Sequence, residues 1–122
     1  MASETTRIMI VEDDTEVAES VAELLRHNGF VVEIAGNGEI AVQRAQAEDF
    51  SITFMDVHMP IMNGAESCLE IKRLKPQARV VMMTGLDEWV AGNAVSLGAE
   101  GLLRKPFCPQ ALLKLVDPVR PQ

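Results

Sequence analysis

The sequence predicts a doubly wound α/β domain, in which helices cover both faces of a five-stranded parallel sheet. Short apolar runs alternate along the chain with segments whose apolar residues recur at helical spacing. The runs show no alternation of apolar and polar residues, which is typical of parallel strands buried on both faces. A chain of 122 residues with 48% apolar content has the size and composition of one such domain.

The strands are expected at the apolar runs, and a helix is expected after each strand. The predicted strand ranges are 7–11, 30–35, 51–55, 80–84 and 101–103. Asp14 or Thr15 can cap the first helix, and Asn28 with Gly29 can end it. The second helix should run from 37–38 to about residue 49, and its expected apolar stripe comprises Ile40, Ala41 and Ala45.

The last three helices are marked by similar signals. The third should follow Asn63 and Gly64 and end before Pro76. Its apolar residues lie three apart, at Ala65, Cys68, Ile71 and Leu74. The fourth is expected over 88–97 and the fifth over 109–116. We expect residues 1–6 to be a disordered leader, residues 7–117 to form the domain, and residues 118–122 to be a tail or the start of a linker.

Composition excludes several classes of protein. A net charge of −7 and a pI near 4.7 argue against direct nucleic-acid binding, which needs clustered Lys and Arg. No apolar stretch approaches the roughly 20 residues of a membrane helix. Cys68 and Cys108 lie far apart in a chain with no signal-like start. We therefore expect a cytoplasmic protein with free thiols, both packed as small apolar groups.

Five polar residues and one proline follow the apolar runs. They are Glu12, Asp13, Asp56, Thr84, Lys105 and Pro106. In an open parallel sheet, ligands bind at the carboxyl ends of the strands, so these residues should converge there. Three carboxylates, one hydroxyl and one ammonium group suit a divalent cation and a phosphoryl group.

Five sequence blocks resemble the receiver family of two-component signalling, also called CheY-like. The blocks are Val11-Glu12-Asp13-Asp14, residues 54–60 with Asn63-Gly64, Val81 to Gly85, Gly98-Ala99, and Lys105-Pro106-Phe107. They cover nearly the whole chain in the family's order and spacing. The resemblance implies a (βα)5 flavodoxin-like fold and a phosphorylation-dependent signalling switch that controls a downstream domain or partner.

The resemblance also implies a role for each site residue. Asp56 would accept a phosphoryl group from a phosphohistidine of a sensor kinase or phosphotransfer protein. Mg2+, with Mn2+ as a substitute, would be ligated by Asp13, Asp56 and the backbone carbonyl of His58, whereas Glu12 would act through a bound water. Lys105 and Thr84 would contact phosphoryl oxygens. Pro106 would follow a cis peptide bond and aim the lysine. Such a domain is not an enzyme in the usual sense, since it catalyses only its own phosphorylation and dephosphorylation.

The switch departs from the family pattern at one position. Thr84 would move toward the phosphoryl group, but Leu102 stands where the family usually has a rotating aromatic residue. We therefore expect a muted or rerouted switch. His58 and Leu86 would flank the path of the hydrolytic water, and because neither positions water well we expect slow loss of the phosphoryl group.

The expected partners follow from the same resemblance. The kinase or phosphotransfer protein should dock near the first helix, using Val17, Ala18 or nearby side chains. The downstream effector or output domain is not identified by the sequence, and a phosphorylation-linked homodimer is a further expectation. Neither a membrane nor nucleic acid is expected to bind this domain.

Alternatives remain at this point. Asp14 is better explained as a helix cap than as a ligand. A phosphatase of the haloacid dehalogenase type would carry an acid at the position of His58, and a flavodoxin-like cofactor binder would lack the acidic residues 12–14. A degenerate receiver that serves only as a binding module is disfavoured by the intact Asp56, Thr84 and Lys105.

Overall fold

The predicted sheet is confirmed by the computed structural model, which describes residues 6–57, 59, 61–85, 98–105 and 108–116. The strands are β1 (Arg7–Val11), β2 (Val31–Ala35), β3 (Ile52–Asp56), β4 (Val80–Thr84) and β5 (Gly101–Arg104). The helices among these residues are α1 (Thr15–His27), α2 (Gly38–Ala47), α3 (Gly64–Leu74) and α5 (Pro109–Val116). The helix predicted over 88–97 lies outside the described residues.

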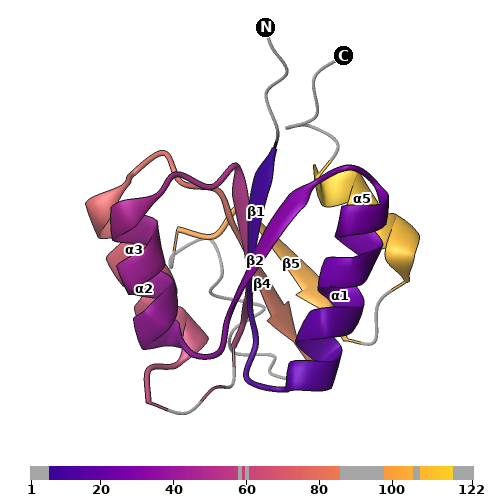
Figure 1. Ribbon diagram of the computed structural model, residues 1–122. Coiled ribbons are helices and arrows are strands. Elements are labelled where there is room, and N and C mark those ends of the chain that lie inside the picture. Colours follow the sequence, from indigo (N-terminus) through magenta and orange to yellow (C-terminus); the bar gives the residue numbers. More distant parts are fainter. Residues whose placement is uncertain (1–5, 58, 60, 86–97, 106–107, 117–122) are drawn as a thin grey trace, which may run out of the picture.

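All five strands are parallel, in the order β2-β1-β3-β4-β5. Helices α2 and α3 cover one face of the sheet, and α1 and α5 cover the other (Figure 1). The strand order reverses between β1 and β3, which is the switch point where open α/β sheets bind ligands. The loops after β1 and β3 therefore border the expected site.

Each strand contributes side chains to two separate cores, because successive residues of a strand point to opposite faces. Met9, Met55 and Met82 pack with Ile71 of α3 on one face. Ile8, Phe54, Val81 and Met83 pack with Ala18, Leu25 and Leu112 on the other face. Burial on both sides explains why the strands lack polar alternation.

Short polar side chains begin three of the helices. Asp14 caps α1 by accepting from the backbone N–H groups of Glu16 and Val17. Asn37 caps α2, and Asn63 and Glu66 form a capping box at the start of α3. These contacts satisfy N–H groups that have no partner within the helix. These hydrogen bonds support the interpretation of Asp14 as a helix cap and not as a metal ligand.

Several predicted details were wrong. Strand β3 begins and ends one residue later than expected, so Asp56 is its last residue, and Phe30 precedes β2. Ile40 is 36% exposed, and only the two alanines of its predicted stripe are buried. Cys68 is buried as expected, but Cys108 is exposed.

One further correction concerns partner docking. Ala18 is 1% exposed and belongs to the core, so it offers no surface to a kinase.

Helices among the described residues are too short or too polar to cross a membrane.

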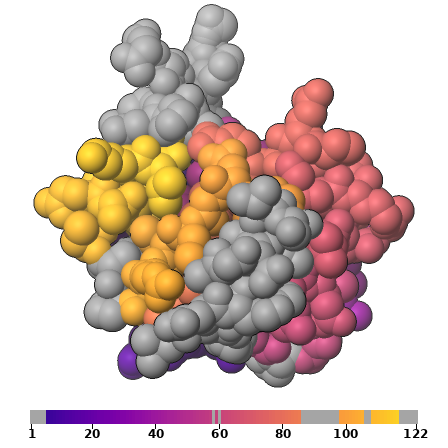
Figure 2. Space-filling model, turned by 180° about the vertical axis from the view of Figure 1, so that it is seen from behind, coloured from indigo at the N-terminus to yellow at the C-terminus, as the bar shows by residue number. Residues whose placement is uncertain are grey.

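Figure 2 shows the molecule from behind, with residues 98–105 (orange) at the surface beside α5 (yellow). Strand β5 is the outermost strand on that side of the sheet, and β4 is its one neighbour in the strand order. Within it, Leu103 is buried, whereas Leu102 is half-buried and packs against the core beneath α2 and α3.

Candidate acidic phosphoacceptor site

The register of the strands brings the predicted site residues to one edge of the sheet. Val11 of β1 pairs with Met55 of β3, so the residues that come directly after them, Glu12 and Asp56, lie next to each other at the ends of the two strands. Asp56 in turn pairs with Met83, the residue before Thr84. The backbone N–H of Lys105 donates to the Thr84 carbonyl over 2.7 Å. Residues from four parts of the chain therefore meet at the carboxyl ends of β1, β3, β4 and β5.

Lys105 joins two buried carboxylates at this edge. Its Nζ donates to Oε1 of Glu12 over 2.7 Å and to Oδ1 of Asp56 over 3.2 Å. Glu12 is 3% exposed and Asp56 is 6% exposed. Buried carboxylates need a compensating charge, and in the structure Lys105 supplies it. This contact between Lys105 and Glu12 was not expected from the sequence, although the crowding of carboxylates pointed to a need for positive charge.

Burial and charge together shift the pKa values of this group. Burial raises the pKa of Glu12, the hydrogen bond from Lys105 opposes that shift, and the charge of Asp56 adds to it, so the pKa is raised overall. Burial alone would lower the pKa of Lys105, but the hydrogen bond to Glu12 and the charges of both carboxylates raise it overall. The ammonium form of Lys105 is thus favoured, which is the form that can contact a phosphoryl oxygen.

The same edge has a ligand set for a hard cation. Carboxylate oxygens of Glu12, Asp13 and Asp56 all lie within 4.8 Å of one another. Asp13 is exposed, whereas the other two are buried. Mg2+ prefers oxygen ligands and keeps several waters, so a half-open group of carboxylates fits it well.

We expect Glu12 to make the metal-free protein less stable as the pH rises. Its folded-state pKa lies above the ordinary 4.5, so its contribution to the free energy of unfolding is complete at low pH and is lost as the pH rises through the folded-state pKa. Urea denaturation with a chelator should therefore show Glu12→Gln gaining stability relative to the wild type as the pH rises from about 4.5 through the folded-state pKa of Glu12.

Glu100→Gln is a control of opposite sign. The hydrogen bond from Arg79 lowers the pKa of Glu100, so its contribution is present above the ordinary pKa and is lost as the pH falls. That variant should lose stability relative to the wild type as the pH rises toward about 4.5, and the difference should stay constant above that pH. Parallel curves for wild type and Glu12→Gln would contradict the prediction.

Thr84 and Leu102, the two predicted switch residues, lie on adjacent strands. Thr84 ends β4 and is fully buried, beside the strand that carries Asp56. Leu102 lies opposite Met82 on β5, two residues back along the ladder from Thr84. Three other predicted site residues, His58, Leu86 and Pro106, lie outside the described residues, so their roles stay predictions.

Two glycines, each the first residue of a helix, allow close contacts near the site. A Cβ at Gly64 would lie 2.3 Å from the carbonyl oxygen of Asp56 and 2.9 Å from Cα of Val57. A Cβ at Gly38 would lie 2.4 Å from the carbonyl oxygen of Met62. Helices α2 and α3 therefore begin in direct contact with the backbone around the β3–α3 loop. Glycine at these positions is required by packing.

Ile61 in the same loop has an unfavourable backbone conformation. Its φ is 73°, the one positive φ among described residues other than glycine, and its side chain is 75% exposed. Left-handed backbone is costly for β-branched residues. Ile61→Gly should therefore raise the free energy of unfolding by about 1 kcal/mol in urea denaturation.

Ile61→Val is the matched control, because valine keeps the branched Cβ and its strain. Its stability should equal that of the wild type. Equal stabilities for the glycine and valine variants would show that the conformation of Ile61 carries no cost.

Comparison with known proteins now identifies the family. The model of the response regulator receiver domain family matches residues 8–117. The chain belongs to this family. Receiver domains are phosphorylation-dependent signalling switches of two-component response regulators and not classical enzymes. The family match decides against the phosphatase and flavodoxin-like alternatives.

Individual relatives agree with the family. The transcriptional regulatory protein CrdR of Helicobacter pylori is 39% identical over 103 residues, covering 83% of this receiver chain and 48% of CrdR. This chain spans about half the length of most of the transcriptional regulators that it matches.

Two solved structures are similar over nearly their whole length. A CheY-like receiver domain protein from Methanospirillum hungatei has a TM-score of 0.90 at 28% identity, covering 95% of this chain and 94% of that chain. The response regulator TrrA from Thermotoga maritima, solved in complex with Mg(2+)-BeF, has a TM-score of 0.87 at 25% identity, with coverage of 95% and 100%. The receiver fold is therefore shared along nearly the whole chain.

Proposed function

We propose that Asp56 is the phosphoacceptor of this receiver and takes its phosphoryl group from a phosphohistidine of a sensor kinase or phosphotransfer protein. The observation that carries the proposal is the bridge from Lys105 to Glu12 and Asp56 beside Asp13. A carboxylate is ionised at neutral pH and needs no base to act as a nucleophile. Asp56 ends a strand at the switch point, where a donor can approach it.

Mg2+ is the proposed cofactor, and Mn2+ is a proposed substitute. Asp13 and Asp56 would bind it directly, Glu12 would act through a bound water, and the backbone carbonyl of His58 would add a ligand. When bound, the cation would offset negative charge on the phosphoryl group. The complex of TrrA with Mg(2+)-BeF supports this choice for a protein of the same fold.

Lys105 and Thr84 are proposed to stabilise the transferred phosphoryl group. Lys105 would exchange its contact with Asp56 for one with a phosphoryl oxygen, acting as a point charge. The hydroxyl of Thr84 would donate to a second oxygen. Both groups would act on charge that spreads over the equatorial oxygens in a loose, in-line transition state.

The test is phosphorylation by acetyl phosphate, followed by intact mass. The wild type should gain one phosphoryl group in the presence of Mg2+ and none when a chelator is added. Asp56→Asn should gain none under either condition. No gain by the wild type, at any Mg2+ concentration, would favour a degenerate receiver that serves only as a binding module.

We expect activation to move Leu102 little. Its side chain is half-buried against the core beneath α2 and α3, and it lacks the aromatic ring that rotates in other receivers. A crystal structure with beryllofluoride and Mg2+ should therefore show Thr84 shifted toward Asp56 with Leu102 unchanged. Large movement of Leu102 would overturn the expectation of a muted switch.

The remaining proposals concern the whole protein. We infer that this receiver is cytoplasmic and that it controls an output domain or a separate effector. The curated relatives support an output domain, because they include transcriptional regulators about twice the length of this chain. Self-catalysed dephosphorylation and phosphorylation-linked dimerisation belong to the same proposal. Val17 on α1 is half-buried and remains a candidate contact for the kinase.

A further inference from the structure

A pocket of about 530 Å3 lies at the edge of the sheet opposite the acidic site. Helices α2 and α3 end on its two sides, and Thr53 near the start of β3 lies between them. Its apolar lining includes Ala45, Phe50, Ile71 and Ala78. The volume falls within the range of small-molecule sites, which combine an apolar lining with a few polar groups.

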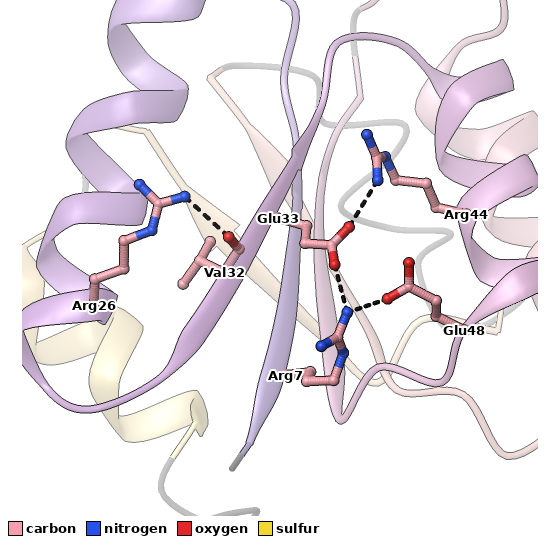
Figure 3. Close-up of polar contacts among 6 residues, drawn as sticks. All are labelled: Arg7, Arg26, Val32, Glu33, Arg44 and Glu48. Atoms are coloured by element: carbon pink, nitrogen blue, oxygen red, sulfur yellow. Dashed lines mark hydrogen bonds and ion pairs between the residues drawn. The ribbon is translucent and has the colours of Figure 1, made fainter.

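One wall of this pocket is fixed by Arg7 of β1. The guanidinium of Arg7 forms ion pairs with Glu48 and Glu33, and Figure 3 shows it lying between these two carboxylates. It also lies over the ring of Phe50, 5.8 Å from the ring centre. The Arg7 carbonyl accepts from the N–H of Ser51 over 2.7 Å. The segment between α2 and β3 is therefore tied to β1.

The opposite wall is fixed by two lysines of the α3 end. Nζ of Lys72 donates to the carbonyl oxygens of Pro76 and Ala78, over 2.8 Å and 2.7 Å. Nζ of Lys75 crosses to the other wall, where it donates to the Glu48 carbonyl over 2.9 Å. The bonds of Lys72 hold one wall in shape, and the bond from Lys75 to Glu48 fixes the distance between the two walls, so the pocket is preformed in the free protein.

Lys75 gives the pocket its charge preference. Its Nζ contacts Oδ1 of Asp49 over 2.5 Å, but the Asp49 side chain is 92% exposed and the Lys75 side chain 33% exposed. Exposed ion pairs contribute little, so another carboxylate can replace Asp49 at small cost. The second carboxylate of the lining, Glu48, is already paired with Arg7. A ligand in the pocket therefore meets an ammonium group and not an unpaired acid.

We propose that this pocket is a binding site for a small organic anion, with an apolar body about the size of an aromatic ring and one carboxylate. The ring would lie on Phe50 and Ala78, which are both half-buried, and the carboxylate would take the place of Asp49 on Lys75. The contact of Lys75 with the Glu48 carbonyl would remain. The site is distinct from the proposed phosphoacceptor, since Thr53 and the ends of α2 and α3 lie at the other edge of the sheet.

The test is a titration of the full chain with 3-phenylpropionate, followed by 1H–15N NMR. Amide shifts should be confined to the pocket residues, with those of Phe50, Thr53 and Ile71 among them. Two probes with the same ring and a different head group, 3-phenylpropylamine and 3-phenylpropan-1-ol, should bind more weakly. Shifts absent from these amides, or equal affinity for the amine, would overturn the proposal.

Two variants distinguish the contribution of the Lys75 charge to ligand binding from that of the pocket volume. Lys75→Gln should weaken binding of 3-phenylpropionate by about fivefold, the value of one exposed ion pair, and leave the alcohol unaffected. Ala78→Leu fills part of the pocket and should weaken both. Lys114→Gln, on the exposed side of α5, is the matched control and should bind as the wild type does. Because acetyl phosphate phosphorylation is measured separately, failure of either proposal is distinguishable from failure of the other.

Discussion

Replacing Lys105 with glutamine should slow phosphorylation of Asp56 by acetyl phosphate about a hundredfold, which is the usual loss when one donor to developing negative charge is removed. Lys105 is the charged donor that the structure places 3.2 Å from the Asp56 carboxylate. Glutamine retains an N–H donor, on a side chain one atom shorter than that of lysine, but has no charge. The rate should be measured by intact mass over time at saturating Mg2+.

Mg2+ binding shows whether the site of this variant is intact. The three carboxylates that lie within 4.8 Å of one another remain, and Lys105 no longer competes as a cation. Calorimetry should therefore show Mg2+ bound at least as tightly as in the wild type. Lys114→Gln should leave the rate unchanged, because Lys114 is exposed on α5. A Lys105→Gln rate within about threefold of the wild type would assign this lysine a structural role only.

Much of this site could be predicted because parallel strands end at the same edge. Once strands were assigned at the apolar runs, Glu12, Asp56, Thr84 and Lys105 were expected together, and the structure brings them together. Order along the chain was enough, since in this fold the edge of the sheet is set by strand direction.

Contacts between groups of the site needed three-dimensional distances. The bond between Lys105 and Glu12 spans 93 positions, and no local pattern distinguishes it from a contact with Asp56 alone. The pocket beside Lys75 likewise depends on how the ends of α2 and α3 are spaced. The periodicity of a single segment predicts neither the contact of Lys105 with Glu12 nor the distance between the ends of α2 and α3.

Exposure was the property most often misjudged. Ile40 matched an apolar stripe and Ala18 was expected at the surface of α1, yet Ile40 is 36% exposed and Ala18 is 1% exposed. Helical spacing defines a face only to within one residue, and a small side chain fits where a helix approaches the sheet closely. Cys108 was expected to be buried by residue type, but it lies outside the cores, just before α5.

Gly64→Ala should lower the free energy of unfolding by about 3 kcal/mol, the upper end for overpacking. The added Cβ would lie 2.3 Å from the carbonyl oxygen of Asp56 and 3.0 Å from its carbonyl carbon. These are backbone atoms of β3, which cannot rotate away as a side chain could. Urea denaturation measures the loss, and the phosphorylation rate should fall too, because the displaced backbone carries the proposed nucleophile.

Helix propensity cannot account for such a loss. Gly64 is the first residue of α3, where alanine is intrinsically favoured over glycine by up to about 1 kcal/mol. Gly36→Ala is the control, since a Cβ there would meet no atom within 4 Å, and its stability should be unchanged or slightly raised. If Gly64→Ala matched Gly36→Ala in both stability and phosphorylation rate, the close approach of α3 to Asp56 would contribute nothing to the free energy of unfolding or to the rate. If only Gly64→Ala lost both, the position of the phosphoacceptor would depend on a residue that has no side chain.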